Sequence, residues 1–487
     1  MKKLKPIFFA GTTSDAGKSL ISTAFCRILK KDGYNPAPFK AQNMALNSYV
    51  TYDGCEIGMA QAVQAMAAGI IPNVNMNPVL LKPNSTNGSQ LVLMGKPIEN
   101  IQARSYYQEN YREKLFSYVS TSFDNLNKIY NPIVMEGAGS FCELNLMKSD
   151  ITNGKVAEYA DASVFLVADI EKGGVFASVF GTINLLPENF KKLVKGIIIN
   201  KFHGSIEYFH EGKKILEEIC KIPVVGIIPF FREFKITDED SVALSHKPSK
   251  ALNGKINIVV IKLPTISNFS DFTLMETIEN INLYYSDIPE EIEKADIIIL
   301  PGCKSTISDL KWLKKMSLDT TILKSHSEGK TILGICGGFQ MLGNIVEDPS
   351  LIEGCTDIEK GLALFNISTI ITSQKELSNT DFNNKNNILC HGYEIHMGIT
   401  DFSNEPQNLN RKKDGSYEGI VKERVFGTYF HDYLNNKAII EMFMAAIGRT
   451  IDFDKSISYN NFDLLAESVR RNCDMDLFYK LVGEVDA

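Results

Sequence analysis

The sequence contains no run of about 20 apolar residues, no long basic stretch and no Cys-X-X-Cys pair. The first absence excludes a membrane-spanning helix, and the apolar run Ile7–Ala10 near the N-terminus is too short for a signal peptide. The lack of basic stretches, with a net charge of −7, argues against a general nucleic-acid-binding protein. The nine cysteines are scattered, which argues against a disulfide framework or a zinc site and favours the reducing cytoplasm.

The 487 residues are too many for one ordinary domain and suggest two or three. Short apolar runs typical of buried strands alternate with helical patterns along the first half. This alternation predicts an α/β fold with helices on both faces of a parallel sheet. A second series begins at Ile256–Leu263 and becomes rich in strands beyond Gly361. The strands expected in the first half are Pro6–Ala10, Ile133–Met135, Ser163–Ala168, Gly196–Ile199 and Val224–Ile228, and the helices are Ser19–Lys31, Ile57–Ala68, Ser105–Ile129 and Ile206–Ile219.

Composition sets the expected boundaries between these parts. The segment 231–254 is polar and charged and is the expected linker. It separates a first α/β domain at 1–230 from a second at 255–445. The remaining residues, 446–487, are predicted to form an amphipathic helical tail. The asparagine-rich segment Asn379–Asn387 is expected to be a mobile loop.

A phosphate-binding loop is predicted directly after the first strand, at Gly11–Ser19 (GTTSDAGKS). A glycine-bearing turn between a strand and a helix directs backbone N–H groups at an anion. In such a loop Lys18 would reach the terminal phosphates and the Ser19 hydroxyl would bind Mg²⁺. Five residues separate the two glycines where four are usual, but the position after the first strand still favours phosphate binding. The predicted ATP contacts here are Thr13, Gly17, Lys18 and Ser19.

Further oxygen ligands are needed for a Mg²⁺–nucleotide site, and Asp53 and Glu136 are the candidates. Glu136 follows the strand Ile133–Met135, and open α/β sheets bind ligands at the carboxyl ends of their strands. The alternatives are a helix-capping carboxylate for Glu136 and a turn residue for Asp53. Asn200, after the strand Gly196–Ile199, is a candidate for contact with the nucleotide base, with a plain turn residue as its alternative.

A candidate nucleophile lies in the second half, within Gly334–Gln340 (GICGGFQ). Cys336 follows an apolar strand and precedes a helix expected from about Gly338. A sharp turn flanked by glycines exposes the side chain and lets backbone N–H groups approach a reacting carbonyl. The helix N-terminus also favours the thiolate. The alternative is a buried core cysteine, but the small residues on both sides favour the nucleophile.

A thiol nucleophile normally requires a base, and His431 is the best candidate because it follows a strand in the same half. His391 and His396 are alternatives that the pattern leaves open. A second loop that could donate a backbone N–H to the reacting carbonyl is predicted at Gly302, after another apolar strand. Its N–H and that of Gly337 would together form an oxyanion hole.

Longer stretches of the chain make a family resemblance recognisable. The second half resembles a class I glutamine amidotransferase domain, and the first half resembles the dethiobiotin synthetase-like ATP-dependent ligases. Together, from about Ile7 to about Asn435, the chain resembles the cobyric acid synthase family. The stretches that carry the resemblance are Pro38–Met44, Leu46–Thr51, Met76–Pro83, Glu136–Ser140, Gly173–Ala177, Leu300–Gly302, Gly334–Gln340, Tyr393–Gly398 and Gly427–His431.

The resemblance implies a coupled reaction. Cys336 would attack the side-chain amide of glutamine, His431 would transfer protons and Gln340 would help to hold the glutamine. ATP would phosphorylate a corrinoid carboxylate, which the released ammonia would convert to an amide. The family amidates the b, d, e and g side chains of adenosylcobyrinic acid a,c-diamide.

The resemblance also implies roles for residues of the first half. Lys40 lies where the related ligases keep a lysine near the transferred phosphoryl group, and Asn200 matches their base-recognition asparagine. Lys82 and Arg104 are weaker candidates for a positive cleft around the acidic corrinoid. The residues implied as phosphate and Mg²⁺ contacts are Lys18, Ser19, Asp53 and Glu136.

The chain departs from the family pattern at three positions. Tyr433 stands where many amidotransferases of this class have the glutamate that orients the histidine, so the orienting group is left open. Asp432 replaces a glycine, and Met59 replaces an expected arginine. Met59 lacks the guanidinium with which the expected arginine would contact a phosphate or the substrate.

Three rival functions share part of these features. Cobyrinic acid a,c-diamide synthase uses the same chemistry at other carboxylates, but Phe39–Met44 and Met76–Pro83 favour the cobyric acid synthase family. A lipid II amidotransferase usually keeps its ligase on a separate chain. A ParA-like nucleotide switch would not need the intact turn around Cys336. The oligomeric state is left open.

Overall fold

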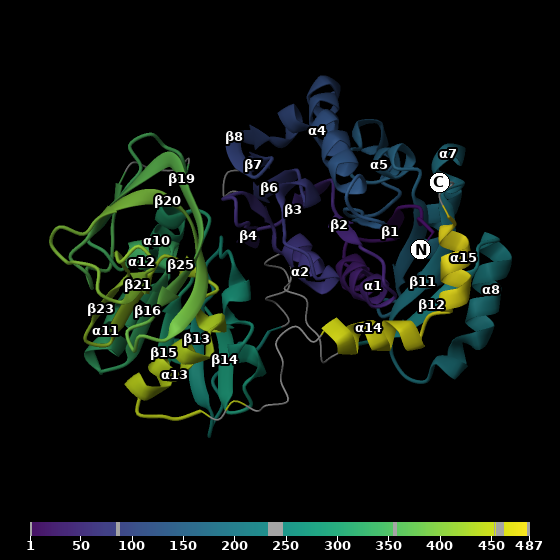
Figure 1. Ribbon diagram of the computed structural model, residues 1–487. Coiled ribbons are helices and arrows are strands. Elements are labelled where there is room, and N and C mark those ends of the chain that lie inside the picture. The colour runs from purple at the N-terminus through teal and green to yellow at the C-terminus, as the bar shows by residue number, and fades with distance from the viewer. Residues whose placement is uncertain are drawn as a thin grey trace.

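The computed structural model describes residues 2–83, 88–231, 247–353, 358–451, 453 and 462–484. It shows two α/β halves, each built on its own mainly parallel sheet (Figure 1). This arrangement confirms the predicted fold class. Most of the expected linker, 232–246, lies outside the described residues.

Six parallel strands form the sheet of the first half, in the order β12-β11-β10-β1-β9-β2. The central strand β1 (Ile7–Gly11) is fully buried, because helices cover both faces of the sheet. Its side chains alternate between two cores, with Ile7 and Phe9 on the α1 side and Phe8 and Ala10 on the other. The other strands are β2 (Ala37–Phe39), β9 (Ile133–Glu136), β10 (Ser163–Asp169), β11 (Val194–Phe202) and β12 (Val224–Pro229).

Helices and two small sheets complete the first half. The predicted helices are confirmed with shifted ends, and the expected Ser105–Ile129 is divided into two. The helices are α1 (Lys18–Lys31), α2 (Met59–Ala68), α3 (Ala103–Tyr106), α4 (Glu109–Asn127), α5 (Gly154–Tyr159), α6 (Val175–Leu185), α7 (Glu188–Lys191) and α8 (His210–Cys220). The small sheets contain β3 (Gln42–Met44), β6 (Val79–Pro83), β7 (Gly88–Leu93) and β8 (Lys96–Gln102), and the hairpin of β4 (Ser48–Val50) with β5 (Glu56–Gly58).

The second half repeats the α/β plan with the strand order β14-β13-β15-β16-β24-β23. Only β23, at the edge, runs antiparallel to its neighbour in this sheet. The strands are β13 (Ile256–Ile261), β14 (Ile281–Ser286), β15 (Ile297–Leu300), β16 (Thr331–Ile335), β23 (Ile420–Lys422) and β24 (Val425–Thr428). The helices are α9 (Pro289–Ile292), α10 (Thr306–Lys315), α11 (Leu318–Ser327), α12 (Gly337–Met341) and α13 (Lys437–Ala446).

A further, mostly antiparallel sheet lies beside this one and is dominated by a long hairpin of β19 (Ser368–Asn383) and β20 (Leu389–Asp401). The prediction of a loop over Asn379–Asn387 was wrong for its first part, because β19 continues to Asn383 and pairs with β20 up to Leu389. Cross-strand pairing there overrides the turn preference of asparagine. The other strands are β17 (Ile345–Glu347), β18 (Ile358–Lys360), β21 (Asn410–Lys412), β22 (Tyr417–Glu418) and β25 (Phe430–His431).

The last two helices, α14 (Phe462–Arg471) and α15 (Met475–Val482), return to the first half and pack beside α1 and β11 (Figure 1). Arg27 of α1 binds Asp463 of α14 through two hydrogen bonds of 2.7 and 3.2 Å. Phe478 of α15 is fully buried, with ring centroids 4.5 Å from Phe25 and 4.7 Å from Phe165. The C-terminal helices therefore complete the core of the first half.

The β4–β5 hairpin joins the two halves. Its apolar side chains share a buried cluster with Tyr393 and Ile395 of β20. Glu56 of β5 accepts hydrogen bonds from Lys82 of its own half, at 2.8 Å, and from Lys375 of β19, at 2.5 Å. Within the described ranges, no helix is both long and apolar enough to cross a membrane.

Candidate active site

Cys336 lies at the turn between β16 and α12, in a strained backbone conformation. Its φ is 52° and its ψ is −110°, which a non-glycine residue rarely adopts and which is found mainly at functional sites. The turn needs glycines, because a Cβ on Gly338 would lie 2.0 Å from the carbonyl oxygen of Leu300. The local sequence therefore presents the thiol at the carboxyl end of the sheet, as the elbow pattern predicts.

β25 places His431 near this thiol, whose Sγ donates a hydrogen bond to the carbonyl oxygen of Ile395 at 3.5 Å. Nδ1 of His431 lies 2.7 Å from Oδ2 of Asp271, and these two residues and Cys336 are buried. Burial opposes a charge on the imidazole, but Asp271 and Cys336 outweigh it and raise the pKa of His431 to about 10. A protonated imidazole beside a cysteine favours the nucleophilic thiolate.

Asp271 stands in the position of an orienting group, which the sequence left open. It lies on the short turn η5 (Phe269–Phe272), and its Oδ1 also accepts the backbone N–H of Asp432 at 2.7 Å. Sequence reasoning missed it because it is 160 residues from His431 and no local pattern marks it. A carboxylate bound to the distal nitrogen fixes the imidazole tautomer and ring orientation.

Asp432 stands where the family usually has glycine, and it keeps a backbone conformation that glycine would adopt. Its φ of 61° lies in the left-handed region, which glycine adopts freely and aspartate tolerates. Its side chain accepts a hydrogen bond of 2.6 Å from Asn435. Asp432 therefore supports the loop after His431, while Tyr433 turns away and binds Asn410 at 3.1 Å.

The predicted oxyanion and glutamine contacts lie around the same turn. Gly302 follows β15 and packs against His431, since a Cβ there would lie 2.8 Å from Cε1 of the ring. Gly337 begins α12, directly after the thiol. Gln340 is buried one helical turn further on, where its Oε1 accepts a hydrogen bond from Thr306 at 3.0 Å. The structure therefore gathers all five predicted residues of this half.

The two alternative histidines lie elsewhere on β20. Nδ1 of His391 is hydrogen-bonded to Oδ1 of Asp381 at 2.9 Å. His396 is 3.6 Å from Glu394 and stacks on Tyr429, with ring centroids 3.9 Å apart. The geometry therefore favours His431 as the base.

The predicted phosphate loop in the first half folds as expected between β1 and α1. Lys18 curls over the loop, and its Nζ donates to the carbonyl oxygens of Thr13, Ser14 and Gly139 at 2.8 to 3.0 Å. Gly17 has a φ of 89°, and a Cβ there would lie 2.1 Å from the Asn200 amide. Asn200, the predicted contact for the nucleotide base, donates to the carbonyl of Ala16 at 2.9 Å and so lies beside the loop.

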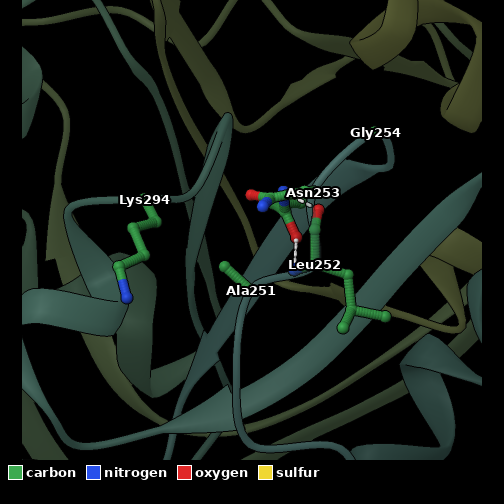
Figure 2. A pocket seen from close by; sticks show the side chains of 6 residues that line it. Ala251, Leu252, Asn253, Gly254 and Lys294 are labelled. Carbon is green, nitrogen blue, oxygen red and sulfur yellow. Dashed lines mark hydrogen bonds between the residues drawn. The ribbon is translucent and has the colours of Figure 1, made fainter.

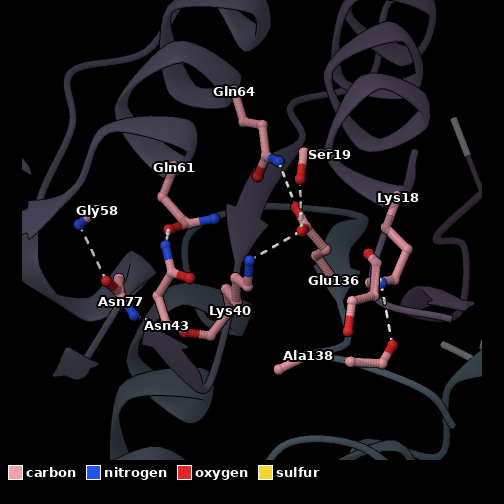
Figure 3. A network of polar contacts seen from close by, with 12 residues as sticks. Lys18, Ser19, Lys40, Asn43, Gly58, Gln61, Gln64, Asn77, Glu136 and Ala138 are labelled. Atoms are coloured by element: carbon pink, nitrogen blue, oxygen red, sulfur yellow. Dashed lines mark hydrogen bonds and ion pairs between the residues drawn. The ribbon is translucent and has the colours of Figure 1, made fainter. Parts of the chain in front are cut away.

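Glu136, at the end of β9, is the centre of a buried polar cluster (Figure 3). Its carboxylate accepts hydrogen bonds from Ser19 at 2.7 Å, from Lys40 at 3.0 Å and from Gln64 at 2.7 Å. Burial opposes its charge, but Lys40 and these hydrogen bonds hold the pKa of Glu136 below its usual value. The structure thus joins the phosphate loop, Lys40 and Glu136 in one site.

Gln64 was missed by the sequence reasoning, although a signal existed. It lies on α2, whose only polar side chains are Gln61 and Gln64, three residues apart and therefore on one helix face. Gln61 accepts a hydrogen bond from Asn43 at 3.1 Å (Figure 3). Paired amides on an otherwise apolar helix indicate a polar site that the helix must face.

Three other sequence candidates lie away from Glu136. Asp53 is exposed on the β4–β5 turn, where it binds the hydroxyl of Thr51. Lys82 is buried at the junction between the halves, against Glu56 and Ser48. Arg104 is exposed on α3. Met59, at the arginine position, packs against the apolar cluster at this junction.

A cavity of about 650 Å³ is lined by the segment Ala251–Gly254 together with Asn257 and Lys294 (Figure 2). Asn257 lies at the start of β13, whereas Cys336 follows the end of the parallel strand β16. The cavity therefore lies at the amino ends of the strands, whereas the thiol lies at their carboxyl ends. We assign the chemistry to the residues around Cys336 and Glu136.

Comparison with known proteins agrees with this division. The CobQ/CobB/MinD/ParA nucleotide binding domain family matches residues 7–242. The CobB/CobQ-like glutamine amidotransferase domain family matches residues 257–439. The fold and the two sites thus define a glutamine amidotransferase fused to a nucleotide-binding domain.

Full-length relatives narrow this class. The cobyric acid synthase of Phocaeicola vulgatus is 46% identical over 494 residues, covering 100% of both chains. That of Parabacteroides distasonis is 47% identical and covers 98% of this chain and 99% of its own. That of Clostridium novyi is 41% identical, with 99% and 98% covered. The chain belongs to the cobyric acid synthase family.

Proposed function

We propose that this protein amidates the b, d, e and g carboxylates of adenosylcobyrinic acid a,c-diamide, using ATP and glutamine. The observation that carries the proposal is the pair of sites in one chain. The Cys336–His431–Asp271 arrangement suits amide hydrolysis, and the cluster of Lys18, Ser19, Lys40 and Glu136 suits phosphoryl transfer. The choice of acceptor rests on the similarity to full-length cobyric acid synthases.

In the proposed glutaminase step, Sγ of Cys336 attacks the side-chain amide carbon of glutamine. The amide oxygen gains negative charge, which the N–H groups of Gly302 and Gly337 would stabilise. His431 donates its proton to the departing nitrogen, so ammonia leaves and a thioester remains. His431 then accepts a proton from water, whose oxygen attacks the thioester to release glutamate and free the thiol.

In the proposed ligase step, a corrinoid carboxylate oxygen attacks the γ-phosphorus of ATP, forming an acyl phosphate and ADP. Lys18 and Lys40 would balance the charge on the transferred group, because phosphoryl transfer depends mainly on positioning and charge neutralisation. Ammonia then attacks the acyl carbon and phosphate leaves, giving the amide after loss of a proton. The donor role of ATP agrees with the nucleotide-binding family match.

The residues around Glu136 fit Mg²⁺. Ser19 Oγ and Glu136 Oε1 are 2.7 Å apart, close to the ~3 Å between adjacent ligands of an octahedral ion bound at about 2.1 Å. Gln64 Oε1 is buried and has no hydrogen-bond partner among the described residues, so it offers a further oxygen. Bound Mg²⁺ would neutralise phosphate charge. The described residues contain no group of three or more His, Cys, Asp or Glu side chains placed for a metal, and Mg²⁺ in phosphoryl-transfer sites commonly uses few protein ligands.

The test is product mass after incubation with ATP, Mg²⁺, glutamine and adenosylcobyrinic acid a,c-diamide. We expect up to four steps, each with the mass change of replacing a hydroxyl by an amino group. A parallel reaction with cobyrinic acid tests the rival a,c-diamide synthase activity. An unchanged diamide, or amidation of cobyrinic acid at a and c alone, would refute the acceptor assignment.

A further inference from the structure

Two asparagines form a crossed pair of hydrogen bonds between the halves. Oδ1 of Asn47, from the first half, accepts the backbone N–H of Phe269 at 3.0 Å. Oδ1 of Asn268, from the second half, accepts the backbone N–H of Ser48 at 3.1 Å. Asn47 is 1% exposed and Asn268 is 2% exposed, so loss of either acceptor would leave a buried N–H without its partner.

This asparagine pair lies directly beside the group that orients the catalytic histidine. Phe269 is the first residue of η5, and Asp271 is two residues further along the same turn. Asn268, which precedes η5, has a left-handed backbone with a φ of 51°. Backbone hydrogen bonds at this turn run from Asp271 to Asn268 and from Thr273 to Ser270. Outside contacts help to fix its position: Asn435 of the second half donates to the Ser270 carbonyl at 3.0 Å, and the first half supplies the two bonds of the asparagine pair.

A second contact reaches the other side of His431. The Ser48 carbonyl oxygen accepts a hydrogen bond from the Tyr393 hydroxyl at 3.0 Å. The Tyr393 ring stacks on His431, with centroids 5.5 Å apart and planes 24° apart. The segment Asn47–Ser48 therefore contacts both the turn that bears Asp271 and the ring that packs against the imidazole.

We propose that Asn47 is a positioning residue for glutamine hydrolysis, acting through Phe269 and Asp271 on His431. The nucleotide-binding half thus supplies part of the support for the thiol site in the other half. This inference rests on the proposed function, because it assigns Asn47 to the glutaminase step of that reaction.

The same segment is joined to the phosphate site by its backbone. The carbonyl of Asn47 accepts the N–H of Met59 at 3.2 Å, at the start of α2. Gln64 of α2 binds Glu136. Because the link to α2 uses the main chain, truncating the Asn47 side chain leaves that contact with the ligase site in place.

The experiment compares Asn47→Ala with Asn379→Ala in the full-length protein. Asn379 also binds across the halves, donating to the Val50 carbonyl at 2.7 Å and to the Tyr49 hydroxyl at 3.3 Å, but among the described residues no hydrogen bond links it to η5. For Asn47→Ala we expect kcat for glutamate release to fall about 10- to 100-fold, with KM for glutamine changed less than about threefold. Ammonia-dependent amidation should stay near the wild-type rate, and Asn379→Ala should keep both activities.

A double-mutant cycle separates positioning from general weakening of the interface. In an Asp271→Asn background, Asn47→Ala should reduce kcat by less than about twofold, because its effect passes through the lost carboxylate. Full additivity, or equal losses in Asn47→Ala and Asn379→Ala, would overturn the proposal. If Asn47→Ala does not fold, Asn268→Gly removes the opposite acceptor while keeping the left-handed backbone, and the same loss is expected.

The controls also distinguish this inference from the proposed function. A wild-type protein that releases no glutamate from glutamine refutes the function and the inference together. A wild-type protein that is active, with an Asn47→Ala variant equal to it in kcat, refutes the inference alone.

Discussion

The two sites differ in how their charged groups are held. In the second half, Asp271 is hydrogen-bonded to His431, which lies near Cys336, an arrangement that suits amide hydrolysis. In the first half, Lys18 binds carbonyl oxygens of its own loop and Lys40 binds Glu136. Packing preorganises the thiol site, whereas the phosphate site must exchange internal contacts for ligand oxygens. Damage at the thiol site should therefore remove one nitrogen source, and damage at the phosphate site should stop every route to the amide.

The sharpest test of this contrast is Cys336→Ala. It removes the proposed nucleophile, whose sulfur lies near His431, so glutamine-dependent amidation should fall by about 10⁴-fold or more. Ammonia-dependent amidation should persist, because the phosphate site is untouched. Product formation with each nitrogen source is the measurement. Loss of both routes would mean that the thiol has a role beyond glutamine hydrolysis.

Asp271→Asn tests the preorganisation within the thiol site. The change keeps the size of the side chain but removes the charge that holds the imidazolium, and we expect kcat for glutamine hydrolysis to fall about 10³- to 10⁴-fold. The folded protein holds the pKa of His431 at about 10, so activity should decline as the pH rises through that value. Without Asp271 the pKa falls, and the alkaline limb should move to lower pH.

The matched control for that experiment is ammonia-dependent amidation, measured over the same pH range. It should keep the wild-type profile in Asp271→Asn, because His431 takes no part in the ligase step. An unshifted alkaline limb in glutamine hydrolysis would show that Asp271 does not set the protonation of His431.

Lys40→Met tests the other side of the comparison. The substitution removes the charge 3.0 Å from Glu136 while keeping an unbranched side chain of similar length. Amidation from either nitrogen source should fall about 10²- to 10³-fold, as for the loss of one electrostatic contact to a developing charge. Glutamine hydrolysis measured alone should be less affected. Selective loss of the glutamine route would contradict the division between the two sites.

The sequence predicted those parts of both sites that depend on local chain geometry. The Cys336 elbow and the Lys18 loop are each a strand, a tight turn and a helix, and their glycines are required by the close approaches seen in the structure. Glu136 and His431 were also recognisable, because each follows an apolar strand. These residues stand at strand ends, and strand ends can be read from an apolar pattern.

The parts that the sequence did not predict depend on packing between distant segments. Asp271 becomes an orienting group only because η5 packs against the loop after β25. The β4–β5 hairpin is two short strands with few apolar residues, and its partners come from the other half. The docking of α14 on α1 depends on contacts across more than 400 residues, such as Arg27 with Asp463. The hydrophobic periodicity of a single helix or strand does not predict contacts between such distant segments.

The smallest expected effect is that of Asp432→Gly, which restores the family's usual residue. The backbone already has a φ of 61°, and glycine adopts this conformation without strain. The N–H that binds Asp271 belongs to the main chain and is kept, so kcat for glutamine hydrolysis should change less than about threefold. The loss of the hydrogen bond to Asn435 should lower the melting temperature slightly, offset in part by relief of the left-handed strain. A large fall in kcat would instead assign part of the orienting role to the Asp432 carboxylate, and the thiol site would then depend on two carboxylates around His431.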